Sequence, residues 1–342
     1  MSAKSIKSSN DIKIDFVIPW VDGNDPAWRD EKSKYTPQLQ EDSREERYRD
    51  WDNLRYWFRG VEQFTPWVNK IYFITWGHVP DWLNTQNERL VIVNHRDFIS
   101  SEHLPVFNVN PIEMNLHRIK GLSEHFVYFN DDMFIIDNMN KHDFFKDGLP
   151  CETAALNVHC PDVRFNTYGH LQAIGIINKY FDYRKTLLQY WRKWFSPKNG
   201  KNVFRTLYLL PCPRFSGIYQ THLPTSFLKS TFETLWRLEP ELLEETSASR
   251  FRNKLDYTQW LFRDWQLASG NFMPRNSNIG KSYILEENSS SIFYVEKYIQ
   301  QQKGKMICIN DSTLTDDKFC NYKDRVIMAF QSILPEKCSY EK

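Results

Sequence analysis

Residues 14–26 read Ile-Asp-Phe-Val-Ile-Pro-Trp-Val-Asp-Gly-Asn-Asp-Pro, and this stretch decides the fold that we expect. Its first five residues form a short, mostly apolar run, which is typical of a buried strand. The cluster from Trp20 to Pro26 is rich in turn-forming residues. The stretch therefore predicts a buried strand that ends in a polar turn.

Other apolar runs in the first half of the chain share this pattern. They are predicted to be strands and cover residues 71–74, 90–93 and 126–129. Apolar residues at helical spacing separate them, at 54–61 and 112–119. Strands that alternate with helices over residues 14–136 predict an α/β fold, with a mainly parallel, Rossmann-like sheet flanked by helices.

Polar residues follow the first and fourth predicted strands. Asp22 lies in the turn after the first, and Asn130, Asp131 and Asp132 come directly after the fourth. Ligands of parallel sheets bind beyond the carboxyl ends of the strands. We therefore expect these side chains to share one edge of the sheet.

The second half of the chain has a different texture. A helix is expected near residue 183, because large apolar residues recur there at helical spacing. They would form one apolar face: Tyr183, Leu187, Tyr190, Trp191 and Trp194. Further helices are expected over 226–237, 240–248, 255–268 and 315–333, with a strand at 306–309. We divide the chain into a flexible tail (1–12), an α/β core (13–179), a largely helical lobe with His222 and Arg252 (180–300), and a returning strand and helix (301–342).

Composition excludes several classes of protein. The chain has 342 residues, of which 41% are hydrophobic, and its mean hydropathy is −0.60. These values exclude a collagen and a mostly disordered chain, and no apolar run reaches the length of a membrane-spanning helix. The 44 basic and 43 acidic residues give a net charge of +1, so we expect no nucleic-acid partner.

The cysteines and the N-terminus indicate the compartment. Residues 1–10 contain lysines but no apolar run, so they do not resemble a secretory signal. The six cysteines form no C-x-x-C pair, which makes a structural zinc site unexpected. We expect reduced thiols and a cytoplasmic location.

Oxygen-bearing side chains at the strand ends suggest a cation. Asn130, Asp131 and Asp132 offer adjacent oxygens, and Asn310 and Asp311 follow the late strand. Mg²⁺ and Mn²⁺ prefer oxygen ligands and often bridge to substrate phosphates. Asp131, Asp132, Asn310 and Asp311 are therefore the candidate metal ligands; solvated turns and helix caps are the alternative for both clusters.

The first turn is a candidate donor-binding site. Gly23 allows close approach of the backbone to a ligand, and Asp22 offers an acceptor for a ribose, a uracil or a metal-bound water. Trp20 adds an aromatic face beside them. An Asx-Pro turn without any binding role is the alternative.

Candidate acid–base and phosphate-binding groups are scattered along the chain. Glu113 and His117 are four residues apart on one helical face, with Arg118 adjacent. A carboxylate or an imidazole can act as a general base, and an arginine can stabilise a phosphoryl group. His222 precedes Leu223-Pro224, and Arg252 lies four residues before Asp256. Surface pairs and salt bridges are the alternatives.

These residues also carry a resemblance to the Stealth family. Phe16–Pro26 resembles its first signature, and Arg47-Tyr-Arg-Asp-Trp51 through Phe129-Asn-Asp-Asp-Met133 its second. His222-Leu-Pro224 with Phe251-Arg252 is similar to the third, and Cys308-Ile-Asn310-Asp311 to the fourth. The family includes bacterial capsular-polysaccharide phosphotransferases and the catalytic part of the lysosomal-enzyme GlcNAc-1-phosphotransferase.

The resemblance implies a GT-A-like fold and a reaction. A hexose-1-phosphate, commonly N-acetylhexosamine-1-phosphate, passes from a UDP-sugar to a hydroxyl of a saccharide or lipid-linked glycan. UMP leaves, a phosphodiester forms, and a divalent metal, Mg²⁺ or Mn²⁺, assists. Such a chain works in capsule or cell-surface polysaccharide synthesis. Residues 13–179 would then bind the nucleotide sugar.

The resemblance and the residue chemistry together suggest roles. Asp132, with Asp131 and Asn310, would hold the metal against the diphosphate; Asp22, with Trp20, Gly23 and Asn130, would seat the donor. His222 or Glu113 would deprotonate the acceptor, and both alternatives stay open. Arg252 and Arg118 would neutralise charge on the transferred group, which suits phosphoryl transfer.

Other functions remain open at this point. A metal-dependent glycosyltransferase would attack the sugar carbon and release UDP, and a carbohydrate-binding module would use the aromatic excess of 15% without catalysis. The aromatic and basic segment 180–205 permits a peripheral contact with the inner membrane surface. A core-packing helix with a solvated basic face is the alternative for that segment.

Overall fold

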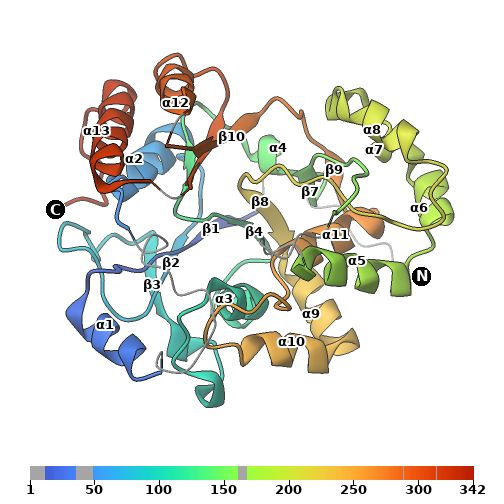
Figure 1. Ribbon diagram of the computed structural model, residues 1–342, viewed down its shortest axis with the longest axis horizontal. Helices are drawn as coiled ribbons and strands as arrows, with labels where there is room; N and C mark the ends of the chain where they lie inside the picture. Colours follow the sequence, from blue (N-terminus) through green and yellow to red (C-terminus); the bar gives the residue numbers. More distant parts are fainter. Residues whose placement is uncertain (1–11, 36–48, 161–167, 288, 313) are drawn as a thin grey trace.

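A five-stranded sheet forms the centre of the computed structural model, which describes residues 12–35, 49–160, 168–287, 289–312 and 314–342 (Figure 1). The strand order is β3-β2-β1-β4-β8. The strands are β1 (Ile14–Pro19), β2 (Ile71–Thr75), β3 (Leu90–Asn94), β4 (His125–Tyr128) and β8 (Thr225–Leu228). All neighbours pair in parallel except β4 and β8, which are antiparallel. The expected mainly parallel α/β sheet is confirmed.

Strand β1 is buried on both faces, and this explains its apolar sequence. Phe16 and Ile18 pack into one hydrophobic cluster, whereas Val17 packs into a second. Successive side chains of a strand point to opposite faces, so the two clusters lie on either side of the sheet. A parallel sheet covered on both faces needs such continuous apolar strands.

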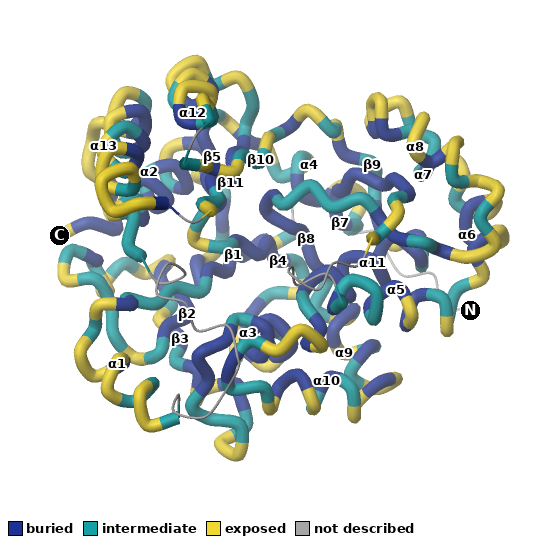
Figure 2. The backbone as a smooth tube through the Cα atoms, in the orientation of Figure 1, coloured by how far each residue is buried: buried dark blue, intermediate teal, exposed yellow. Residues whose placement is uncertain are grey.

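Helices from both halves of the chain cover the two faces. Helices α2 (Leu54–Phe64), α12 (Ser291–Gln300) and α13 (Asp316–Ile333) contribute to the first cluster. The second receives α3 (Val109–Asn115), α5 (Tyr168–Tyr180), α9 (Lys229–Leu238) and α11 (Trp260–Ala268). The remaining helices are α1 (Pro26–Ser33), α4 (Lys141–Phe144), α6 (Tyr183–Gln189), α7 (Trp191–Trp194), α8 (Asn202–Tyr208) and α10 (Pro240–Ser247). In Figure 2 the strands of the sheet are coloured mostly dark blue, as buried residues, and the surrounding helices have yellow, exposed residues on their outer faces.

Two small sheets complete the fold. Strand β5 (Met133–Ile135) follows β4 closely and pairs antiparallel with β11 (Met306–Asp311), which pairs parallel with β10 (Gly280–Leu285). The other small sheet contains β6 (Phe145–Lys146), β7 (Leu149–Glu152) and β9 (Met273–Pro274). The C-terminal part of the chain thus returns to the exit of β4.

Several element boundaries differ from the expectation. Residues 226–228, predicted to be helical, belong to β8, because pairing with the edge of β4 competes successfully with the helical pattern. The helix predicted over 255–268 begins only at Trp260, and the one over 112–119 is α3 followed by a 3₁₀ turn at Leu116–Arg118.

The helix expected near residue 183 is also different. It divides into α6 and α7 at Tyr190, and Trp191, expected on the apolar face, is exposed. The predicted flexible tail lies outside the described residues apart from Ile12, which packs against the first cluster. In the described ranges, no helix combines the length and the apolar character needed to cross a bilayer.

Gly60 tests the packing of α2 on β5. A Cβ atom at Gly60 would lie 2.5 Å from the backbone oxygen of Ile135. We expect Gly60→Ala to lower the free energy of unfolding by about 1–3 kcal/mol, because the backbone of β5 cannot yield as a side chain can. Urea denaturation measures the change.

Gly175 provides the matched control for that substitution. It also lies in a helix, α5, but a Cβ atom there meets nothing within 4 Å. Gly175→Ala should leave stability unchanged or raise it by up to about 1 kcal/mol through helix propensity. Equal stability of the two variants would show that the close approach at Gly60 is not tight.

Candidate active site

Asp132 lies where the main sheet meets the small sheet of β5. The parallel pairing continues beyond β4, since the amide of Phe129 donates to the carbonyl of Val17 (2.9 Å). Three residues later the chain has reached the small sheet, and the carbonyl of Asp132 accepts from the amide of Ile309 in β11 (2.9 Å). The backbone of Asp132 is therefore fixed by strands from both ends of the chain.

The carboxylate of Asp132 faces a histidine and a thiol. Its Oδ2 lies 3.8 Å from Nε2 of His222, an ion-pair distance that is too long for a hydrogen bond. The Cys308 thiol donates to the same oxygen at 3.4 Å. Ligating atoms of the three side chains lie within 4.8 Å of one another.

His222 is held in an unusual backbone conformation. Its φ is +49°, in the left-handed region that non-glycine residues seldom adopt, and such strain is often found at functional sites. Its side chain keeps 39% of its surface exposed, so the ring can be reached from solvent. Burial acts to lower the pKa of His222, but the Asp132 carboxylate outweighs it and raises the pKa overall.

Glu113 of α3 is a buried carboxyl group beside this pair. It accepts from the Tyr128 hydroxyl (3.1 Å) and from the amide of Gln259 (2.8 Å). Burial raises the pKa of Glu113 to about 7, although both hydrogen bonds and the nearby positive charges act against the shift. A carboxyl group with this pKa can exchange a proton near neutral pH.

Arg252 comes from the loop between α10 and α11. Asp256 organises this loop, because its carboxylate accepts from the amide of Asn253 (3.0 Å) and from the side chain of Asn108 (2.8 Å). The preceding residue, Phe251, is buried against Phe107 with ring centroids 5.4 Å apart. The loop that carries Arg252 is thus fixed on both sides of that residue.

Electrostatic interactions show that these elements meet. The charges of Arg252 and His222 both act on the Glu113 carboxyl group and favour its ionised form. His222 in turn contacts Asp132. The structure thus brings Arg252 and His222 near Glu113, and His222 next to Asp132, whereas their roles in one site remain a prediction.

The oxygens around Asp132 fit a hard divalent cation. Oδ1 of Asp132 and Oδ1 of Asn130 are buried and have no hydrogen-bond partner among the described residues. Two orphaned oxygens so close in sequence suit Mg²⁺ or Mn²⁺. Burial and the Asp132 charge raise the pKa of Cys308 well above its ordinary value and so favour its neutral thiol form.

The other predicted metal ligands lie next to this point. Burial raises the pKa of Asp131 to about 7, assisted by the charges of Asp132, Asp50 and Asp311. Asp131 nevertheless retains solvent-exposed surface. Asn310 donates to the Cys308 sulfur at 3.7 Å. Asp50, which sequence analysis did not single out, belongs to the same acidic group.

The carboxyl ends of β1, β2 and β3 border a second, open cleft of about 510 Å³. The amide of Asp22 donates to Nε2 of His78 (2.8 Å), and Trp20 packs edge-on against the same ring. Asp25, His78 and Trp76 line the cleft together with Asn94 and Arg96. His78, Trp76, Asn94 and Arg96 were not predicted, although the strand-end rule that selected Asp22 applies equally to residues 76 and 94.

Some predicted groups have local structural roles in the structure. The carbonyl of Gly23 accepts from Arg29 (2.6 Å), and Asp25 caps α1 by accepting from the amide of Trp28 (2.7 Å). Arg118 is exposed, and its guanidinium lies 4.2 Å from the ring centroid of Trp236 on α9. The donor-binding roles of Gly23 and Arg118 remain predictions.

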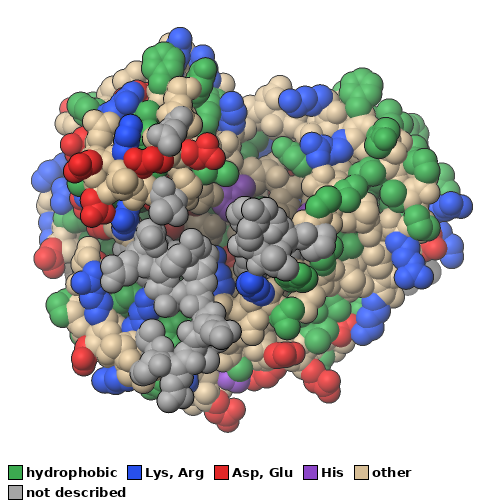
Figure 3. Space-filling view, in the orientation of Figure 1, with side chains coloured by type: hydrophobic (Ala, Val, Ile, Leu, Met, Phe, Trp, Pro, Cys, Tyr) green, Lys and Arg blue, Asp and Glu red, His purple; other side chains and the backbone are tan. Residues whose placement is uncertain are grey.

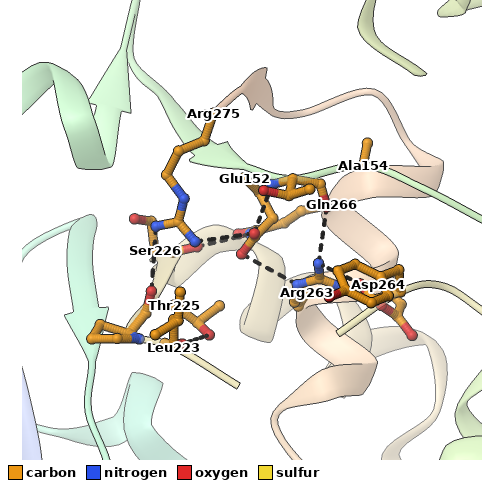
Figure 4. A network of polar contacts seen from close by, with 12 residues as sticks. Glu152, Ala154, Leu223, Thr225, Ser226, Arg263, Asp264, Gln266 and Arg275 are labelled. Carbon is orange, nitrogen blue, oxygen red and sulfur yellow. Dashed lines mark hydrogen bonds and ion pairs between the residues drawn. The ribbon is translucent and has the colours of Figure 1, made fainter. Parts of the chain in front are cut away.

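A buried ionic network holds the chain on both sides of His222 (Figure 4). Arg263 donates to the carbonyl of Tyr219 (2.8 Å), and Arg275 to the carbonyl of Pro224 (3.4 Å). Both arginines pair with Glu152, at 3.2 and 3.1 Å. Burial acts to raise the pKa of Glu152, but the two arginines outweigh it and hold the pKa below its usual range. The network fixes the segment that presents His222.

Comparison with known protein families gives two matches. Residues 13–40 match the model of Stealth protein conserved region 1, and residues 47–151 match that of conserved region 2. The matched residues include Asp22, Glu113 and Asp132. They end before His222 and Arg252, so the resemblance of those segments to the third signature stays a prediction.

Curated relatives match nearly the whole chain. A capsular polysaccharide phosphotransferase of Streptococcus pneumoniae, WcwK, is 44% identical over 96% of this chain and 98% of its own length. A receptor polysaccharide phosphotransferase of Streptococcus oralis, WefC, is 41% identical over 96% and 99%. Among solved structures, the galactosyltransferase LgtC has 9% identity and a TM-score of 0.39, and it covers 93% of this chain and 96% of that one.

The pKa of Glu113 predicts a pH-dependent stability. The pKa of Glu113 is about 7 in the folded protein and near 4.5 in the unfolded chain, so the folded protein binds the carboxyl proton more tightly. The stability that this proton contributes is therefore complete below pH 4.5 and is lost as the pH rises to about 7. Glu113→Gln removes that loss. We expect the variant to be more stable than the parent by up to about 3 kcal/mol at pH 8 and equally stable near pH 4.

Urea denaturation at both pH values measures this effect. Glu233→Gln, at an exposed glutamate of α9, is the control and should change stability at neither pH. A Glu113→Gln protein that is less stable than the parent at pH 8 would mean that burial does not destabilise the ionised form of Glu113.

Loss of Glu152 should be strongly destabilising. Glu152→Ala leaves Arg263 and Arg275 buried without their shared carboxylate, so we expect the free energy of unfolding to fall by about 3–5 kcal/mol. Glu31→Ala removes a partly exposed partner of Lys34 at the surface and should cost less than about 1 kcal/mol. Similar midpoints for the two variants in thermal unfolding would contradict the assigned importance of the network.

Proposed function

The chain belongs to the Stealth family of polysaccharide phosphotransferases, and we propose that it transfers a hexose-1-phosphate from a UDP-sugar to a saccharide hydroxyl. The donor that we propose is a UDP-N-acetylhexosamine. The acceptor is a saccharide or a lipid-linked glycan of a capsular or cell-surface polysaccharide. The contact of Asp132 with His222, beside Glu113 and Arg252, is the observation that carries the proposal.

The acceptor hydroxyl attacks the β-phosphorus of the donor in this mechanism. A bond forms between that oxygen and the β-phosphorus, and the bond from the β-phosphorus to the oxygen bridging the α-phosphorus breaks. UMP leaves with the bridging oxygen, and the sugar stays joined through a phosphodiester. The acceptor proton passes to the imidazole of His222, whose side chain is partly exposed and whose Nε2 faces the Asp132 carboxylate.

Two other side chains act on the charge that develops. Arg252 lies beside Glu113 and supplies a positive charge for the oxygens of the transferred phosphoryl group. When it is ionised, the Glu113 carboxylate stabilises the positive charges of Arg252 and His222. Because its pKa is about 7, Glu113 can also accept the proton that His222 has taken from the acceptor. His222 is therefore the first base in the proposal and Glu113 the second.

The metal has a place in this arrangement. Asp132 and Asn130 would hold it through their orphaned oxygens, with Asp131 and Asp311 supplying further negative charge nearby. A bound Mg²⁺ or Mn²⁺ neutralises the diphosphate and so makes the β-phosphorus easier to attack. A donor that reaches from the cleft at Asp25, Trp76 and Asn94 towards Asp132 would follow the carboxyl edge of the sheet.

Product analysis tests the reaction itself. The protein is incubated with a panel of UDP-sugars, Mg²⁺ and oligosaccharide acceptors, and the released nucleotide is identified. UMP supports sugar-1-phosphate transfer, whereas UDP supports a glycosyltransferase. Chelation of the metal with EDTA should abolish release, and added Mg²⁺ should restore it.

Removal of a catalytic side chain should lower the rate strongly. We expect His222→Ala and Arg252→Ala to lower kcat by on the order of 100- to 1,000-fold, by analogy with the loss of one stabilising group at an oxyanion. Arg237→Ala, at an exposed residue of α9, should retain the parent rate. Near-normal turnover of a folded Arg252→Ala protein would remove Arg252 from the mechanism.

A further inference from the structure

Helices α6, α7 and α8 lie in a strongly basic stretch of the chain. Residues 181–214 contain eight lysines and arginines but one acidic residue, Asp182. This local excess of seven positive charges contrasts with a net charge of +1 for the whole chain. Most of these basic side chains are exposed, including Lys185, Lys198 and Lys201.

The same stretch carries large apolar side chains on its surface. Fourteen large hydrophobic residues are exposed in the described part of the chain, and six of them fall within residues 188–210. They are Leu188, Trp191, Phe204, Leu207, Tyr208 and Leu210. Phe204 is 74% and Tyr208 85% exposed. Hydrophobic and basic side chains gather on this end of the molecule in Figure 3.

These helices are nevertheless anchored firmly on their inner side. Trp194 is fully buried, and Asn199 bonds to the carbonyls of Lys193 and Trp194 and to the amide of Ala154. The Thr206 hydroxyl accepts from the amide of Leu156 (3.1 Å). Because the inner faces of these helices pack and form hydrogen bonds with the rest of the protein, the aromatic side chains on their outer faces belong to a fixed surface.

Aromatic and leucine side chains among lysines and arginines suit one environment in particular. Tryptophan, tyrosine and phenylalanine partition to the boundary between lipid headgroups and acyl chains, and basic side chains are attracted to anionic headgroups. A protein partner would need complementary acidic groups around an apolar centre, whereas an anionic bilayer presents both features over any area. The charge excess and the exposed rings thus complement an anionic lipid surface.

We propose that the exposed side of α6, α7 and α8, with Trp191, Phe204 and Tyr208 as its apolar anchors, binds the surface of an anionic phospholipid bilayer. This binding goes beyond the proposed reaction and does not depend on it. It would hold the enzyme at a membrane, where lipid-linked glycans are found. The helices that dock are distinct from the turns and loops that carry Asp132, His222 and Arg252.

Flotation with vesicles tests the proposal without turnover. The full chain is mixed with vesicles of phosphatidylcholine alone, or of phosphatidylcholine and phosphatidylglycerol. We expect binding only to the anionic vesicles, and we expect it to weaken as salt is added. Absence of binding to anionic vesicles at low salt would overturn the proposal.

Matched variants locate the surface. The triple variant Trp191→Ser, Phe204→Ser and Tyr208→Ser should lower the bound fraction about tenfold or more, and so should the variant Lys185→Gln, Lys198→Gln and Lys201→Gln. Phe293→Ser with Tyr294→Ser alters two residues of α12 that are 53% and 55% exposed, and it should bind like the parent. Circular dichroism confirms that each variant is folded.

Two results would contradict this assignment. The first is an equal loss of binding in the α12 variant, which would place the lipid contact elsewhere. The second is a parent protein that sediments as a dimer and becomes a monomer in the Trp191, Phe204 and Tyr208 variant, while vesicle binding is unchanged. The exposed rings would then cover a second copy of the chain.

Discussion

The parallel pairing of β1 with β2 and β4 is the constraint on which the site depends. Each strand is buried on both faces, so its register is fixed by packing as well as by hydrogen bonds. The carboxyl ends of β1 and β4 therefore open at one edge, and the residues that follow them meet there. Asp22 and Asp132 each follow a strand that ends at this edge.

Buried charge in this protein is concentrated around the site and its supports. Glu113 is held against its preference for water, and Glu152 is stabilised by two arginines that also fix the His222 segment. Such groups contribute little net stability, because desolvation offsets their attraction. Their role is to fix the positions of other residues. His222 has a positive φ, and its surroundings must hold the backbone in that strained conformation.

The sequence predicts the strands well, because continuous apolar runs such as 71–74 and 126–129 have few alternatives in a chain of this size. Motif resemblance also selects Asp132, His222 and Arg252; the structure brings His222 next to Asp132 and Arg252 near Glu113, and their roles stay a prediction. Prediction from the sequence fails where contacts between distant parts of the chain determine the structure. Residues 226–228 satisfy a helical pattern, and only the edge of β4 makes them a strand. Arg263 and Arg275 give no local signal, since their roles depend on Glu152, more than one hundred residues away.

The return of β11 to β5 has a consequence for biosynthesis. Asp132 receives its backbone partner from Ile309, and the thiol beside its carboxylate belongs to Cys308. A growing polypeptide on the ribosome therefore possesses the strands of the main sheet long before it possesses the complete candidate site. Until the residues of β11 have left the exit tunnel, Asp132 lacks the backbone partner that Ile309 supplies, so the candidate site is completed only late in translation.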